Sequence, residues 1–120
     1  NLSGGQRQRM SLARGLLAAA DSSLIMLDEP TSALDQITEA RVFQRLRHGL
    51  PDACVVASVH RMSTLVHFDR IVLMADGRVV DTGTVAELQE RQALFREMLG
   101  EELAETGQDV ATATPLLAAV

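Results

Sequence analysis

The sequence has no tryptophan, no tyrosine and no lysine, and only one cysteine among its 120 residues. Three phenylalanines are the only aromatic side chains, so a folded core must be mainly aliphatic. The single cysteine, Cys54, excludes an intrachain disulfide, and its place in an apolar run predicts a buried small hydrophobe rather than a reactive thiol. All positive charge comes from eleven arginines.

Long apolar runs are also missing. None approaches the ~18 residues that a membrane-spanning helix needs, and no secretory signal peptide is visible. The formal net charge of -5 argues against a nucleic-acid-binding face. The length suits one small core, that is, one domain or part of one. Any association with a membrane must therefore come from a partner or from further sequence.

Hydrophobic periodicity predicts alternating helices and strands. Apolar residues at helical spacing indicate helices over residues 3–20, 36–48 and 85–103. Continuous apolar runs indicate strands over residues 24–27 and 53–59, and the first is typical of a strand buried on both faces of a parallel sheet. A hairpin with a turn at Asp76-Gly77 follows. Thr84 and Glu87 form a capping box before the last helical stretch.

This order of elements predicts an α/β fold, a parallel sheet with flanking helices followed by a β-hairpin and C-terminal helices. The two apolar strands are joined through a helix, so they should be parallel. Ligands gather at the carboxyl ends of such strands, where Asp28, Glu29 and His60 fall. We expect residues 1–104 to form the domain portion, and the small, polar residues of 105–120 to form a disordered tail.

The start of the first helix is suited to binding a phosphate. Ser3 and Gln6 match a capping box with Ser3 at the N-cap. Gly4 and Gly5 have no Cβ, so an anion could closely approach the free N–H groups at the positive end of the helix dipole. Each glycine costs about 1 kcal/mol in a helix relative to alanine. A simple glycine-rich cap is the structural alternative.

Two adjacent carboxylates close the first strand. One can hold Mg²⁺ through water, and a second, aimed differently, can orient or deprotonate an attacking water. Asp28 and Glu29 fit these two roles, and a solvated acidic turn is the alternative. His60 could hydrogen-bond a terminal phosphate, although a lone histidine is more often structural. Asp35 fits the N-cap of the second helix, a role that could coexist with a functional one.

Taken in order, these pieces resemble the ATPase domain of ABC transporters of the exporter type. LSGGQ at residues 2–6 is similar to the signature motif of that family, and LIMLDEP at 24–30 resembles Walker B with its adjoining glutamate. SALD at 32–35 resembles the D-loop, and SVHRMST at 58–64 contains a residue similar to the switch histidine. Four ordered motifs are far more specific than any one of them. The resemblance covers roughly residues 1–103 and implies a partial P-loop NTPase-type sheet.

The resemblance implies a role for each matching residue. Asp28 would help to hold Mg²⁺, while the catalytic residues would be Glu29 as base or water-orienting group and His60 as a contact of the ATP γ-phosphate. Asp35 would communicate across a head-to-tail dimer of two ATPase domains. The residues that would contact ATP held by the opposite subunit are Ser3, Gly4, Gly5 and Gln6.

The resemblance also implies partners and a location. A transporter ATPase would bind transmembrane domains at the cytoplasmic face of the bacterial inner membrane, use ATP and Mg²⁺, and bind no nucleic acid. The P-loop of the family, G-x-x-x-x-G-K-S/T, does not occur in this lysine-free sequence. We therefore expect a truncated fragment, the C-terminal part of an ATPase domain, which hydrolyses ATP within the complete domain and is inactive alone.

Two other functions stay open at this point. One is a non-transport ATPase of the same superfamily, acting in chromosome maintenance, DNA repair or translation. The acidic balance and the lack of coiled-coil heptads or zinc-type cysteines favour the transporter over it. The other is a non-hydrolysing dimerisation or regulatory module for an intact ATPase domain. Transmembrane helices in the parent gene would test the first, and a pull-down with an intact domain would test the second.

Overall fold

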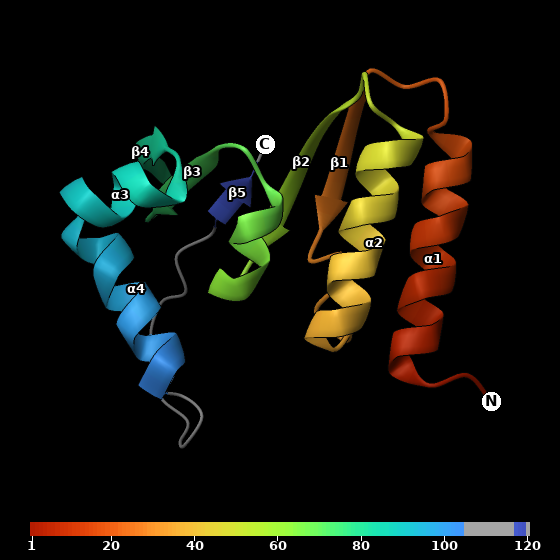
Figure 1. The fold of residues 1–120 in the computed structure, drawn as a ribbon, viewed down its shortest axis with the longest axis horizontal. Coiled ribbons are helices and arrows are strands. Elements are labelled where there is room, and N and C mark those ends of the chain that lie inside the picture. Colours follow the sequence, from red (N-terminus) through yellow and green to blue (C-terminus); the bar gives the residue numbers. More distant parts are fainter. Residues whose placement is uncertain (105–116, 120) are drawn as a thin grey trace.

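The computed structural model describes residues 1–104 and 117–119 (Figure 1). Its elements are, in chain order, α1 (Gly4–Ala18), β1 (Leu24–Asp28), α2 (Gln36–Gly49), β2 (Cys54–Val59), the 3₁₀ helix η1 (Met62–His67), β3 (Ile71–Ala75), β4 (Arg78–Gly83), α3 (Val85–Arg91), α4 (Ala93–Ala104) and β5 (Leu117–Ala119). The predicted α/β class is confirmed. Both predicted capping boxes are present, at the starts of α1 and α3.

One mixed sheet carries the fold, with strand order β1-β2-β5-β3-β4. As predicted, β1 and β2 are parallel, and their register pairs Asp28 with Ser58. β3 and β4 form the predicted antiparallel hairpin. Its turn depends on positive φ angles at Asp76 (49°) and Gly77 (73°), a conformation that glycine adopts without cost. Because β1 and β2 are parallel neighbours, their carboxyl ends, which were expected to carry the site, lie side by side.

The predicted disordered tail at 105–120 falls mostly outside the described residues. Residues 105–116 and 120 lie outside the described residues, so for them the prediction stays a prediction. Leu117–Ala119 differ, because they form β5, which pairs antiparallel with both β2 and β3. Composition did not predict this strand, since backbone pairing on both sides favours a strand whatever its side chains.

The core lies where β2 and β3 meet η1, α3 and α4. Its buried residues are Ala57, Val59, Met62, Leu65, Ile71, Leu73, Leu88 and Phe95. All but one are aliphatic, as the scarcity of aromatic residues required. Across residues 1–104, no helix combines the length and the apolar character that crossing a membrane requires.

Two predictions about burial are wrong. β1 is buried on one face only, because Ile25 is 5% exposed while Leu24 and Met26 are 55% and 76% exposed. The described elements leave open the face on which these two side chains lie. Cys54 is exposed rather than buried, since it is the first residue of β2 and pairs in register with the exposed Leu24. Apolar composition alone did not distinguish a one-sided strand from a two-sided one.

The helical stretch predicted over residues 85–103 is two helices, separated at Gln92. The backbone of Gln92 is extended (φ -112°, ψ 111°), and its side-chain Nε2 donates to Asp81 Oδ2 at 2.6 Å. The Arg96 guanidinium then donates to two carbonyl groups in the last turn of α3, at 2.9 and 2.8 Å. Side-chain hydrogen bonds therefore replace the backbone bonds that a continuous helix would have made.

Asp81 on β4 binds the side chains of Arg91 and Gln92 at the end of α3. Arg91 Nε and Nη2 donate to its two carboxylate oxygens at 2.8 and 2.9 Å. These bonds from Arg91, with a further one from Gln92, hold the pKa of Asp81 well below its usual value. The stability of the chain should consequently depend on pH through this carboxylate.

Asp81→Asn is expected to destabilise the chain at neutral pH and to have little effect in acid. Because the folded-state pKa is lowered, the stabilisation is fully present above the unfolded value of 3.8 and is lost as pH falls toward the folded value. The urea denaturation midpoints of wild type and Asp81→Asn should therefore converge as the pH falls below 3.8. The control is Asp69→Asn, whose side chain is 82% exposed beside Arg47. A gap between Asp81→Asn and wild type that persists in acid would contradict this account.

Candidate functional site

Asp28, Glu29 and His60 meet at the carboxyl edge of β1 and β2, as predicted from the strand ends. His60 Nε2 lies 2.6 Å from Glu29 Oε1, and both side chains are partly exposed. Ser58 on β2 connects the two acids, since its hydroxyl donates to Asp28 Oδ1 at 2.6 Å and accepts from the Glu29 N–H at 2.9 Å. One carboxylate thus contacts Ser58 and the other contacts His60, so the two serve different partners.

The backbone of Glu29 has a left-handed conformation, with φ of 43°. For a residue with a side chain this costs roughly 1–2 kcal/mol, and it persists only when the surroundings hold it. Here the N–H is held by Ser58 and the carbonyl oxygen accepts from Gln8 Nε2 at 3.0 Å. Strained residues of this kind concentrate at functional sites. The fold therefore fixes the direction in which this carboxylate leaves the strand.

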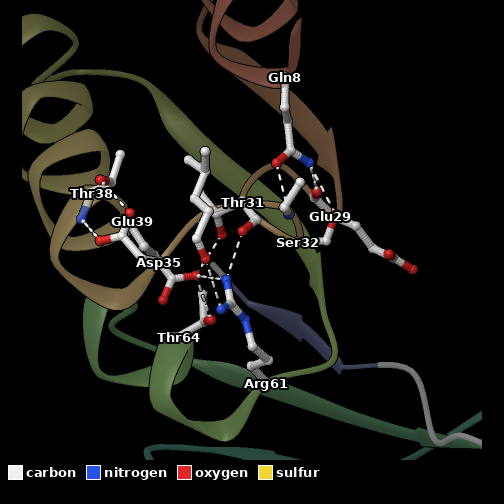
Figure 2. Close-up of polar contacts among 11 residues, drawn as sticks. Gln8, Glu29, Thr31, Ser32, Asp35, Thr38, Glu39, Arg61 and Thr64 are labelled. Carbon is white, nitrogen blue, oxygen red and sulfur yellow. Dashed lines mark hydrogen bonds and ion pairs between the residues drawn. The ribbon is translucent and has the colours of Figure 1, made fainter. Parts of the chain in front are cut away.

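Gln8 fastens helix α1 to the loop that follows β1 (Figure 2). Its amide nitrogen also donates to Ser32 Oγ at 3.0 Å, and its amide oxygen accepts from the Ala33 N–H at 2.9 Å. No sequence motif predicted a role for Gln8. Its position one helical turn after Gly4 and Gly5, on the same helix face, is a signal that could have found it.

Arg61 holds the same loop from the other side (Figure 2). It donates to the carbonyl oxygens of Leu34 and Thr31, and to the carboxylate of Glu39 on α2. A small pocket opens between the loop and the end of β2. Its lining residues are Glu29, Pro30, Thr31, Ser32, Ser58, Val59, His60, Arg61 and Thr64. Carboxylate, imidazole and hydroxyl groups therefore line the same small pocket.

The residues at the start of α1 make polar contacts among themselves. Ser3 N–H donates to Gln6 Oε1 at 2.8 Å, and Gln6 N–H donates to Ser3 Oγ at 3.2 Å. A Cβ added at Gly5 would lie 3.1 Å from the Ala33 carbonyl oxygen, whereas one added at Gly4 would meet no atom of the described residues within 4 Å. Close packing of the chain thus explains Gly5 but not Gly4.

Asp35 is the N-cap of α2, as predicted. Its Oδ1 accepts from the Thr38 N–H at 2.9 Å and its Oδ2 accepts from the Thr38 hydroxyl at 2.7 Å. These bonds hold the pKa of Asp35 below its usual value. Within the described residues, neither Asp35 nor residues 3–6 are brought into contact with Glu29 or His60.

A magnesium ion fits Asp28 as one ligand of several. Within residues 1–104 and 117–119, no three His, Cys, Asp or Glu side chains group closely enough to form a metal cage. Mg²⁺ is usually held by one or two carboxylates, waters and phosphate oxygens, so a complete protein cage is not required. The Asp28 side chain is exposed at a strand end and keeps an oxygen beyond the one that binds Ser58.

The fold is that of an NTPase-type α/β protein. The family model for ABC transporters matches residues 1–32. A β-(1→2)-glucan export ATP-binding/permease protein of Rhodopseudomonas palustris is 43% identical over 97 residues, which cover 81% of this chain. An ATP-dependent lipid A-core flippase of Xanthomonas oryzae pv. oryzae is 39% identical over 104 residues, or 87% of the chain. The chain belongs to the ABC transporter family.

A solved structure gives the same result. A bacterial Atm1-family ABC exporter with ATP bound matches 92% of this chain with a TM-score of 0.74 and 31% sequence identity. The chain spans 16% and 17% of the lengths of the two relatives and 18% of that exporter chain. The predicted family and its exporter type are therefore confirmed, and the similarity concerns a short part of much longer proteins.

Proposed function

We propose that this chain is the C-terminal part of the ATP-hydrolysing domain of an ABC exporter, which uses ATP to drive a substrate across a membrane. The observation that carries the proposal is the 2.6 Å contact of Glu29 with His60 beside Asp28, at the carboxyl edge of a parallel strand pair. The similarity to exporters over 81% to 92% of the chain supports the same function.

In the proposed reaction, a water oxygen attacks the γ-phosphorus of ATP and the bond to the ADP oxygen breaks. Glu29 orients that water and accepts its proton, because its carboxylate is held at a fixed strand end and is still 44% exposed. His60 contacts the γ-phosphate from the same pocket. Asp28 would hold Mg²⁺, which when bound neutralises phosphate charge.

The start of α1 serves a different nucleotide in this proposal. Ser3, Gly4, Gly5 and Gln6 contact ATP held by a second ATPase domain in a head-to-tail dimer, and Asp35 takes part in that interface. Two observations support this assignment, namely the separation of these residues from Glu29 and His60 and the open space at Gly4. The transmembrane domains of the exporter place the dimer at the cytoplasmic face of the membrane.

The 120-residue chain alone is expected to bind Mg-ATP weakly up to millimolar concentration and not to hydrolyse it. The P-loop and its lysine supply most of the phosphate contacts in such domains, and this sequence contains neither. Titration with a fluorescent ATP analogue, with and without Mg²⁺, measures the binding.

The complete protein, extended by the preceding half of the domain, should bind Mg-ATP and release phosphate. Tight, Mg²⁺-dependent binding by the 120-residue chain would contradict the proposal that its phosphate cradle lies elsewhere. Absence of hydrolysis by the complete protein would favour the regulatory module instead.

A further inference from the structure

A buried carboxylate on α2 binds three donors through a single oxygen atom. Glu39 is 1% exposed. Its Oε1 accepts from the Thr31 hydroxyl at 2.6 Å, the Thr64 hydroxyl at 2.8 Å and Arg61 Nη2 at 3.0 Å (Figure 2). Thr31 follows β1, Arg61 follows β2 and Thr64 lies in η1. Glu39 therefore joins two loops that are about thirty residues apart in the sequence.

Arg61 makes a second, direct connection between the same loops. Its Nη2 donates to the Thr31 carbonyl at 2.6 Å and its Nη1 to the Leu34 carbonyl at 3.0 Å. A planar guanidinium presents several donors in a fixed fork, which the ammonium group of lysine cannot reproduce. The residue before Arg61 is His60, and residues 31–34 lie between Glu29 and Asp35. The network thus spans the two segments that carry the proposed catalytic pair.

Stability alone is a weak reason for such a network. A buried ion pair is often no more stabilising than well-packed apolar side chains of the same volume, because both charges lose their hydration. What such a network does provide is a defined geometry, since all the donors must point toward the same acceptor oxygen. Here that geometry fixes the spacing of two loops. Glu29 and His60 lie next to these loops in the sequence, and His60 Nε2 is 2.6 Å from Glu29 Oε1.

We infer that Glu39, Arg61 and Thr64 are positioning residues for ATP hydrolysis. They hold residues 31–34 against residues 60–64, which keeps His60 at Glu29 and links Asp35 mechanically to His60. The inference rests on the proposed function, because it needs a hydrolysis step for these residues to support.

The test compares Thr64→Val with Thr64→Ser in the complete ATPase protein. Valine has nearly the shape of threonine but cannot donate to Glu39, whereas serine keeps the hydroxyl. Thr64→Val is expected to lower kcat about tenfold while KM for ATP changes less than about twofold, because small displacements of reacting groups mainly affect the chemical step. Thr64→Ser should recover most of the wild-type kcat.

Arg61→Lys is the second variant, chosen because the Arg61 side chain is 34% exposed, so that a lysine ammonium there keeps access to solvent. It keeps the charge but loses the fork, so the same loss in kcat at nearly constant KM is expected. The matched control is Arg47→Lys, in which an arginine paired with Asp69 at 2.9 Å on the surface should leave kcat unchanged. Thermal midpoints are measured in parallel, since a merely structural role lowers the midpoint but not kcat per folded site.

Two results would overturn the inference. One is a wild-type kcat in both Thr64→Val and Arg61→Lys, and the other is an equal loss in Thr64→Val and Thr64→Ser. Glu29→Gln is measured in the same preparations. If it hydrolyses ATP at the wild-type rate, the proposed function of that residue fails. If it is inactive while Thr64→Val is fully active, only the positioning inference fails.

Discussion

Glu29→Gln in the complete protein is expected to reduce ATP hydrolysis at least about 100-fold while Mg-ATP still binds. A positioned general base typically contributes about 10²–10⁴ in rate, and an amide of the same size cannot accept a proton from water. The side chain is 44% exposed, so the substitution buries no new polar group. Phosphate release and binding of a fluorescent ATP analogue, measured on one preparation, separate the effect on chemistry from the effect on affinity.

The control for this experiment is Glu97→Gln, in which an exposed glutamate of α4 changes in the same way far along the chain. It should hydrolyse ATP at the wild-type rate. If Glu29→Gln kept near-normal hydrolysis, the base would have to be another group. If instead both binding and hydrolysis disappeared, Glu29 would be needed to hold the nucleotide rather than to activate water.

The features that could be predicted from the sequence are those that neighbouring residues determine. The capping box of Ser3 and Gln6 and the Asp76-Gly77 turn each depend on residues at most three apart. The meeting of Glu29 and His60 needed one further step, that parallel strands end at the same edge of a sheet. Local chemistry together with one rule of topology was enough for these.

Other features depend on contacts that no local pattern reveals. Gln8 reaches the Glu29 carbonyl across 21 positions, and Glu39 would have been taken for part of a solvated helix face rather than a buried acceptor. Cys54 was misjudged because its exposure depends on its position at the first residue of β2. Ser58 is an intermediate case, since the parallel register places it beside Asp28 and could have identified it.

Gly4→Ala is expected to reduce ATP hydrolysis by the complete protein about 100-fold without destabilising the fold. A Cβ at this position would meet nothing within 4 Å in the part of the chain that the structure describes, and alanine favours the helix by up to about 1 kcal/mol over glycine. Any loss of activity must then come from a group outside the chain that approaches the helix start. Backbone N–H groups there bind phosphate only when no side chain keeps the anion away.

Gly5→Ala is the matched comparison, because its Cβ would lie 3.1 Å from the Ala33 oxygen and 3.4 Å from a Leu34 methyl carbon. It should lower the urea midpoint of the chain as well as hydrolysis, since α1 must move away from the loop after β1. Gly4→Ala should lower hydrolysis without lowering the urea midpoint. Full activity in Gly4→Ala would mean that no phosphate approaches the start of α1, and the head-to-tail dimer would lose its main support in this chain. Loss of activity without loss of stability would support the proposal that a phosphate approaches the open helix start at Gly4.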